Sequence, residues 1–127
     1  MPVRGIRGAT TVEENDKDLI LEGTKELLVD LQNRNQFEPE DIVSIFFSMT
    51  YDLNSAFPAE AARMLGWQKV PLFGVQEAEV YDSLKKCIRV LIQINSSKSQ
   101  DEIKHCYLHK AKELRKDLIN NGERKDG

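Results

Sequence analysis

CIRVLIQI, residues 87–94, is the stretch that decides how this chain folds. It is short, apolar and rich in β-branched residues, which is typical of a buried β-strand. Because strand side chains alternate between two faces, four apolar residues share one face: Ile88, Val90, Ile92 and Ile94. The opposite face carries Arg89 between Cys87 and Leu91. We therefore predict a strand with one face in the core and a permanent cation on the other.

Arg89 poses the main chemical question. If the sheet is covered on one side only, the guanidinium simply meets water, and this strand taken alone favours that interpretation. Cys87 and Leu91 flank it on the same face, however, which indicates partial burial, and a partly buried guanidinium needs an anionic or hydrogen-bonding partner. Arg7 lies in a similar position between two glycines. Two arginines on inward-facing strand faces favour a small pocket for an anion.

The composition limits the function classes. With 127 residues, 40% of them hydrophobic, the chain fits a single domain, which we place at residues 1–119 with a flexible polar tail at 120–127. The 18 Lys and Arg against 21 Asp and Glu leave no basic excess, so we expect no nucleic-acid partner. No signal peptide or membrane-spanning stretch is evident, which favours the cytoplasm. Cys87 and Cys106 are expected to be buried free thiols.

Strands and helices alternate along the chain. Strands are predicted at residues 3–12, 42–50, 69–75 and 87–94, and helices at 15–35, capped by Asn15, and at 57–65, ended by Gly66. The capping-box spacing of Ser99 and Glu102 predicts the start of another helix. We expect an α+β fold in which a mixed β-sheet is packed with helices.

Three weaker patterns favour ordinary structure over chemistry. Gly5–Thr11 loosely resembles a phosphate loop but lacks the Gly-Lys-Ser/Thr ending. His105 and His109 have the four-residue spacing of two metal ligands on a helix, but no third ligand is evident, so we predict solvent-facing histidines and no metal site. Glu77 and Glu79 would share a strand face like an acid/base pair, but surface carboxylates are the commoner case.

Six motifs, in order and at consistent spacing, resemble one family, the small monofunctional α+β chorismate mutases. They are RGIRGATTVEEN at 4–15, FPAEAAR at 57–63, GWQKVPL at 66–72, QEAEV at 76–80, LKKCIRV at 84–90 and HCYLHKA at 105–111. The resemblance implies a homotrimer shaped like a pseudo-α/β barrel, with active sites at subunit interfaces. It also implies the Claisen rearrangement of chorismate to prephenate on the route to phenylalanine and tyrosine, with no cofactor.

The resemblance also implies roles for individual residues. Arg89 matches the catalytic cation that hydrogen-bonds the ether oxygen of chorismate as the C–O bond breaks, and Glu77 matches the glutamate that accepts from the ring hydroxyl. Arg7 and Tyr107 match residues that hold carboxylate groups. Seven positions match the family's substrate-binding pocket wall and rim: Phe57, Ala59, Arg63, Phe73, Gly74, Val75 and Leu114.

The chain departs from the family pattern in three places. Gly74 stands where a side chain is expected to contact the substrate, and Glu60 stands where a lysine is familiar near the pocket mouth. An inward-pointing Glu60 would slow the capture of a dianionic substrate. The link after Arg63 is also one residue shorter than expected.

The segment from Ile103 to Leu114 supports two interpretations. Ile103, Tyr107, Ala111 and Leu114 recur at helical spacing. The family instead has a short helix followed by a strand near Tyr107. We predict the strand, because tertiary context often overrides propensity.

Two other functions remain open at this level. One is a non-catalytic trimer of the same architecture that binds a small carboxylate, and the other is an interaction domain whose arginines form interface salt bridges. Glu77 argues against the first, because a site that only holds an anion gains nothing from a nearby carboxylate.

Overall fold

The structure is a computed structural model, and it describes residues 1–115. Two α-helices, five strands and three short 3-10 helices (η) follow one another in this part of the chain: β1 Val3–Thr11, α1 Lys17–Asn35, η1 Pro39–Asp41, β2 Ile42–Met49, α2 Ala59–Met64, β3 Leu72–Gln76, β4 Cys87–Asn95, η2 Gln100–Glu102, β5 Cys106–Tyr107 and η3 His109–Glu113. The predicted end of the domain at residue 119 and the predicted tail at 120–127 lie outside the described residues.

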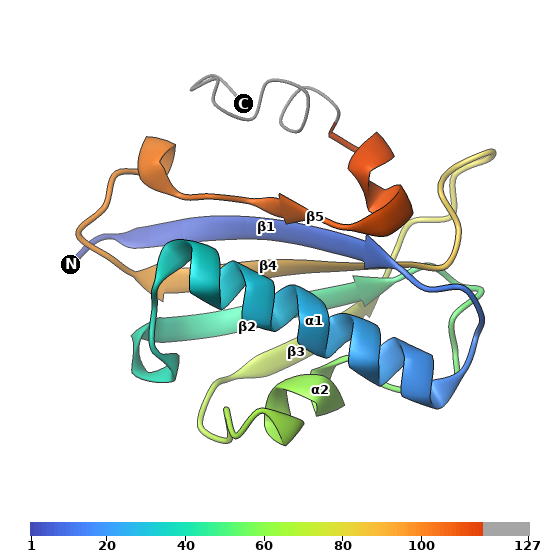
Figure 1. Cartoon of the computed structure of the whole chain (residues 1–127), viewed down its shortest axis with the longest axis horizontal. Coiled ribbons are helices and arrows are strands. Elements are labelled where there is room, and N and C mark those ends of the chain that lie inside the picture. The colour runs from blue at the N-terminus through green and yellow to red at the C-terminus, as the bar shows by residue number, and fades with distance from the viewer. Residues whose placement is uncertain (116–127) are drawn as a thin grey trace.

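One mixed sheet organises the fold, with strand order β3-β2-β4-β1-β5 (Figure 1). β4 runs antiparallel to both of its neighbours, β1 and β2, while the two outer pairs, β2 with β3 and β1 with β5, are parallel. The stretch at 87–94 is therefore the central strand of the sheet. The predicted α+β class and mixed sheet are confirmed.

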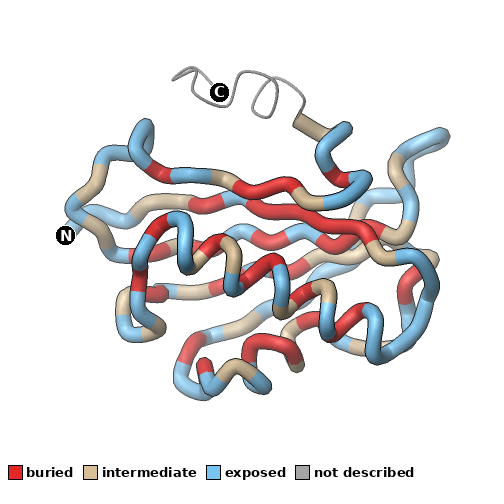
Figure 2. Tube along the Cα trace, viewed as in Figure 1, coloured by how far each residue is buried: buried red, intermediate tan, exposed pale blue. Residues whose placement is uncertain are grey.

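The main core lies between the sheet and the helices. The even-numbered side chains of β4 are at most 5% exposed, as the alternation predicts. Ile88 packs with Ile20 and Leu53 in a separate small cluster, while Val90, Ile92 and Ile94 point into the main core. They meet Leu27, Leu28 and Leu31 of α1, which are fully buried. Figure 2 shows buried residues along β1, β4 and the side of α1 that faces the sheet. α2 adds Ala62 to the same core, and Gly66, at φ +88°, ends the segment that contains it.

The opposite face of the sheet is mostly open. Phe46 and Leu91 are each 39% exposed there, and Phe73 is 59% exposed and packs edge-on against Phe46 with ring centres 5.9 Å apart. A second, small cluster covers one end of this face, where Ala9, Cys87, Tyr107 and Ala111 are buried with Leu84 and Leu114 packed against them. Arg89, which follows Cys87 by two residues on the same face, therefore stands at the border between an apolar cluster and open surface.

Two predicted helix starts need correction. The side chain that caps α1 belongs to Asp16, whose Oδ2 accepts from the Leu19 N–H at 3.0 Å. Asn15 instead bonds to the loop between β2 and α2, where its side-chain amide donates to the Asn54 side-chain oxygen. The Ser99–Glu102 capping box is present, but it begins only the single 3-10 turn η2. Beyond that turn the chain is extended: Lys104 bonds Asn35 through both backbone groups, and Cys106 and Tyr107 pair with β1.

The segment 103–114 follows the family expectation rather than the helical spacing. Cys106 and Tyr107 form β5 beside Gly8 and Ala9, and within the described residues the 3-10 turn η3 follows. The edge of β1 offers unpaired backbone groups, and satisfying them outweighs the helix propensity of the segment. Among the described residues, no helix has the length and apolar character needed to cross a lipid bilayer.

Candidate active site

Arg89 and Glu77 form the centre of the site. The Arg89 Nε atom lies 3.4 Å from the Glu77 Oε2 atom. The same carboxylate oxygen accepts a hydrogen bond from the Ser48 hydroxyl at 2.6 Å. Ser48 lies directly opposite Arg89 in the β2–β4 register, so the two strands present cation and hydroxyl to the carboxylate together. Glu77 itself follows β3 and is anchored by its N–H, which donates to the Met49 carbonyl at 2.9 Å.

Arg7 and Tyr107 join this pair around one hollow of about 410 Å³, which we call the Arg89 hollow. It is lined by Arg7, Gly8, Ala9, Phe46, Phe47, Ser48, Val75, Glu77, Arg89, Val90, Leu91, Tyr107, Leu114 and Arg115. Arg7 reaches it because β1 and β4 pair in register, with Ala9 opposite Arg89. The four residues that the sequence singled out as catalytic therefore line a single concave surface, together with Val75 and Leu114.

The other five predicted wall residues lie outside the Arg89 hollow of a single chain. Phe57 is 77% exposed at the start of the α2 segment, and Arg63 is exposed on α2 itself. Ala59 packs against the main core instead. Phe73 touches the hollow only through Phe46, and nothing lies within 4 Å of a Cβ atom built at Gly74.

Sequence reasoning missed several residues of the Arg89 hollow. Ser48 was overlooked because a serine within an apolar strand carries no motif, although its position opposite Arg89 follows from strand pairing. Arg115 adds a third arginine to the lining. It directly follows Leu114, the last wall residue predicted from the sequence, but no motif reached that far.

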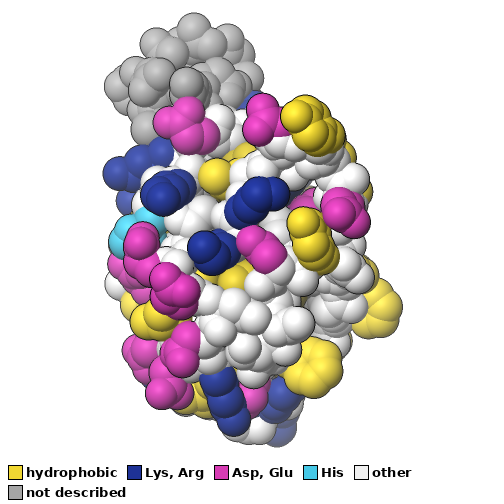
Figure 3. Space-filling model, turned by 90° about the vertical axis from the view of Figure 1, so that its right-hand side faces the viewer, with side chains coloured by type: hydrophobic (Ala, Val, Ile, Leu, Met, Phe, Trp, Pro, Cys, Tyr) yellow, Lys and Arg dark blue, Asp and Glu magenta, His cyan; other side chains and the backbone are white. Residues whose placement is uncertain are grey.

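Figure 3 looks at the end of the molecule where β1 and β2 finish and β4 begins. Basic and acidic side chains alternate on its upper half. The surface therefore does not present one sign of charge as a whole.

A second hollow of about 420 Å³ lies against the loop after Glu77. Its charged lining consists of Asp52, Glu79, Asp82 and Lys85. Three carboxylates against one ammonium would repel an anionic ligand. Glu79 lies in this second hollow and not beside Glu77, so the two glutamates do not form an acid/base pair.

The two histidines do not act together. The His109 Nε2 atom lies 3.2 Å from the Glu26 Oε1 atom on α1, at an exposed position. His105 was expected to face solvent and is only partly exposed, and its Nδ1 atom accepts a hydrogen bond from the Arg7 backbone N–H at 2.9 Å. The segment Gly5–Thr11 is the body of strand β1 and forms no phosphate loop.

Both cysteines are buried free thiols, as predicted. Burial raises the pKa of Cys87 to about 11. Burial, together with a hydrogen bond from its thiol to the Asp30 carboxylate, raises the pKa of Cys106 to about 12. Both thiols stay protonated at neutral pH, so neither supplies a nucleophile.

The fold and the Arg89 hollow define a class: a small α+β protein that can bind a compact anionic molecule on the open face of its sheet. Three arginines can hold carboxylates and stabilise developing negative charge, while Glu77 can accept a hydrogen bond or face developing positive charge.

Comparisons with known proteins identify the family. The family model of chorismate mutase type I matches residues 3–118. The chain is 49% identical over 119 residues to chorismate mutase AroH of Bacillus subtilis (strain 168), covering 93% of this chain and 94% of that protein. It is 46% identical over 117 residues to chorismate mutase AroH of Thermus thermophilus, covering 91% and 96%. A solved chorismate mutase from Clostridium thermocellum superimposes with a TM-score of 0.86 at 47% identity, covering 87% of this chain and 98% of that one.

The chain belongs to the chorismate mutase type I family, which confirms the resemblance seen in its motifs. It is accordingly an isomerase of that family.

Proposed function

We propose that the Arg89 hollow catalyses the Claisen rearrangement of chorismate to prephenate. The observation that carries the proposal is the meeting of Arg89, Glu77, Arg7 and Tyr107 around one concave surface. The reaction is a single pericyclic step within one substrate, so the protein needs to supply orientation and electrostatic stabilisation rather than a nucleophile.

Arg89 is assigned the main electrostatic role. As the ether C–O bond breaks ahead of C–C bond formation, negative charge gathers on the ether oxygen. The guanidinium donates to that oxygen more strongly in the transition state than in the ground state, and only this difference accelerates the reaction. Removing one preorganised donor of this kind costs about 2.7–4 kcal/mol in other enzymes.

The other polar residues select the reactive conformer. Glu77 accepts from the ring hydroxyl and lies close to the positive charge that develops on the ring fragment. Arg7 and Tyr107 hold carboxylate groups of the substrate, so that the side chain lies over the ring. Arg115, which also lines the Arg89 hollow, adds positive charge for a dianionic substrate.

The proposal includes a homotrimer with each site shared between two subunits. The open face of the sheet supports it, because Phe46, Leu91 and Phe73 are large apolar side chains that a monomer leaves in water. The shared site also accounts for three exposed wall residues that lie outside the Arg89 hollow of their own chain. In the proposed trimer, Phe57, Arg63 and Phe73 reach the hollow of the adjacent subunit.

The proposal also covers the location and metabolic role of the protein. We propose a cytoplasmic enzyme of aromatic amino acid biosynthesis whose product leads to phenylalanine and tyrosine. The family membership supports this setting, since the reaction has that place in metabolism.

Product identification tests the activity. We expect purified protein to convert chorismate stoichiometrically to prephenate. Proton NMR of the reaction mixture measures this conversion. If chorismate binds, for example by calorimetry, but stays unchanged, the protein is the non-catalytic carboxylate-binding trimer instead.

Subunit mixing tests the shared site. Arg89→Ala and Arg63→Ala remove residues that the proposal brings together from different subunits. Trimers formed by refolding the two inactive variants together should regain activity, because some of their sites contain neither substitution. Mixed refolding that recovers no activity, with a mass three times 14.5 kDa shown by sedimentation, would contradict the shared site.

A further inference from the structure

The outer edge of β1 is completed by side chains as well as by a strand. β5 has only two residues and pairs only with Gly8 and Ala9. Further toward the N-terminus, the Gln100 side chain takes over: its Oε1 atom accepts from the Gly5 N–H at 3.0 Å, and its Nε2 donates to the Gly5 carbonyl at 2.7 Å. Between these two contacts stands Arg7.

The backbone of Arg7 is held by His105 at this edge. The Arg7 N–H donates to the His105 Nδ1 atom at 2.9 Å, so Nδ1 must be unprotonated. In a neutral imidazole the proton then resides on Nε2. The surroundings favour this neutral form, because burial and the nearby Arg7 and Arg115 charges lower the pKa of His105 to about 4.

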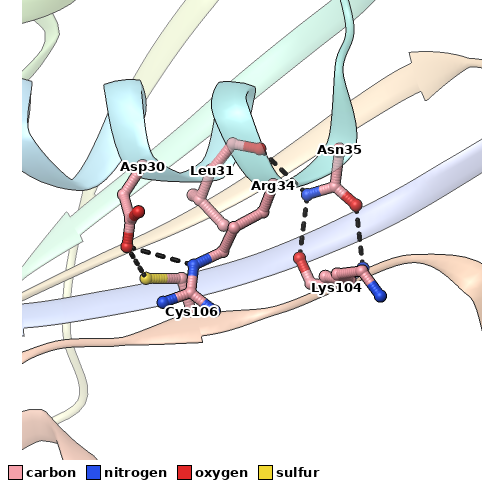
Figure 4. Close-up of polar contacts among 6 residues, drawn as sticks. All are labelled: Asp30, Leu31, Arg34, Asn35, Lys104 and Cys106. Atoms are coloured by element: carbon pink, nitrogen blue, oxygen red, sulfur yellow. Dashed lines mark hydrogen bonds and ion pairs between the residues drawn. The ribbon is translucent and has the colours of Figure 1, made fainter.

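His105 is itself held by its neighbours. The Asn35 side chain at the end of α1 bonds both backbone groups of Lys104: its Nδ2 donates to the carbonyl at 2.8 Å, and its Oδ1 accepts from the N–H at 2.8 Å (Figure 4). On the other side, the Cys106 thiol donates to Asp30 at 2.8 Å (Figure 4). Asn35 is only 3% exposed. The residues before and after His105 are therefore fixed to α1, which aims the imidazole at β1.

We infer that His105 is a positioning residue for Arg7, whose backbone it fixes so that the guanidinium points into the Arg89 hollow. The inference rests on the proposed role of Arg7 in holding a substrate carboxylate. His105 acts through Arg7 and is not itself catalytic. On this account the single acceptor atom Nδ1 carries the function, and the charge of the ring does not.

Three variants isolate that acceptor. His105→Leu removes it, whereas in His105→Asn the Oδ1 atom stands close to the position of Nδ1. Gln100→Ala is the matched control, because it removes two hydrogen bonds from the same edge at Gly5, which has no side chain to misplace. We expect His105→Leu to lower kcat/KM roughly 10-fold, mainly through KM, and His105→Asn and Gln100→Ala to stay within about 2-fold of the parent.

A double-mutant comparison with Arg7→Ala shows whether His105→Leu acts through the Arg7 side chain or through a general structural change. In an Arg7→Ala background the guanidinium is already gone, so adding His105→Leu should lower kcat/KM by less than about 2-fold. A full 10-fold loss in that background would overturn the inference. So would an equal loss in Gln100→Ala, because a general loosening of the edge would then explain the effect.

A spectroscopic test on the parent protein does not depend on activity. Imidazole ¹⁵N spectra at neutral pH should show His105 as the neutral Nε2–H form, and the His105→Asn variant identifies the signal by its loss. An Nδ1–H tautomer or an imidazolium at neutral pH would overturn the inference. If the parent shows the expected tautomer but converts no chorismate, the proposed function fails while the His105–Arg7 contact stands.

Discussion

Arg89 Nε lies 3.4 Å from Glu77 Oε2, with 47% of the arginine side chain and 25% of the glutamate side chain still exposed. An ion pair this exposed contributes little to stability. In the proposed mechanism its effect is to orient the guanidinium before a substrate arrives. Removing either partner should therefore cost activity far more than folding.

The fork of donors on Arg89 should be essential. We expect Arg89→Lys to lower kcat at least about 100-fold, because an ammonium cannot reproduce the planar set of N–H groups. Steady-state kinetics with chorismate measures this, and an unchanged thermal midpoint confirms the fold. Activity close to the parent would mean that positive charge alone suffices.

Gly8 should be required for the core. A Cβ atom at this position would lie 2.7 Å from the Leu31 Cδ1 atom and 3.2 Å from the Leu27 Cδ1 and Val90 Cγ2 atoms. The added methyl group would therefore be crowded by three side chains at once. We expect Gly8→Ala to destabilise the protein by about 1–3 kcal/mol in denaturant unfolding. Gly74→Ala is the control, because nothing lies within 4 Å of a Cβ there. Equal stability of the two variants would show that α1 can shift to make room.

Glu60 should slow substrate capture if its carboxylate faces the shared site. We expect Glu60→Lys to raise kcat/KM several-fold at low ionic strength, with the gain shrinking as salt is added. Measuring kcat/KM across a salt series checks both parts. A value independent of the substitution at low salt would show that the side chain points away from the site.

Acid should weaken the fold through His105. Its pKa falls from 6.5 to about 4 on folding, because of burial and the nearby Arg7 and Arg115 charges. Between these pH values the unfolded chain binds the extra proton, so stability falls as pH drops from 6.5 to 4 and is unaffected above that window. We expect the parent to lose on the order of 2 kcal/mol more than His105→Asn over this range, after allowance for partial exposure. Equal losses in denaturant unfolding would contradict this.

The rate itself should respond differently to pH. The rearrangement transfers no proton, so kcat should be nearly flat across neutral pH. A bell-shaped kcat profile with a limb near neutrality would count against the mechanism.

Much of the sheet could be predicted because its periodicity is local. The alternation in residues 87–94 identified both faces of β4. The pairing register of β1 with β4 then places Arg7 and Arg89 on the same face of the sheet. The spacing of leucines in residues 15–35 likewise located α1. These patterns depend only on which face of a strand or helix must be buried. They can therefore be recognised without knowing which elements pack against that face.

The rest depends on contacts between distant segments. The spacing of Ile103, Tyr107, Ala111 and Leu114 favours a helix, but in the folded protein this segment lies along the unpaired edge of β1. The contact between Arg7 and His105 at that edge joins residues 98 positions apart in the chain. Asp16 rather than Asn15 caps α1 because Asn15 is held by Asn54. Ser48 contacts Glu77, and His105 contacts Arg7, only because folding brings these residues together. No local pattern marks Ser48, and the local spacing of His105 and His109 indicated a metal pair rather than the contact with Arg7.

The most direct test of the central claim is the ultraviolet loss of chorismate with purified protein and excess chelator, measured for the parent beside Arg89→Ala. We predict rapid loss with the parent and a rate near the uncatalysed background with the variant, both folded and of equal mass in solution. Equal rates in the two proteins would show that Arg89 is not the central cation of this site.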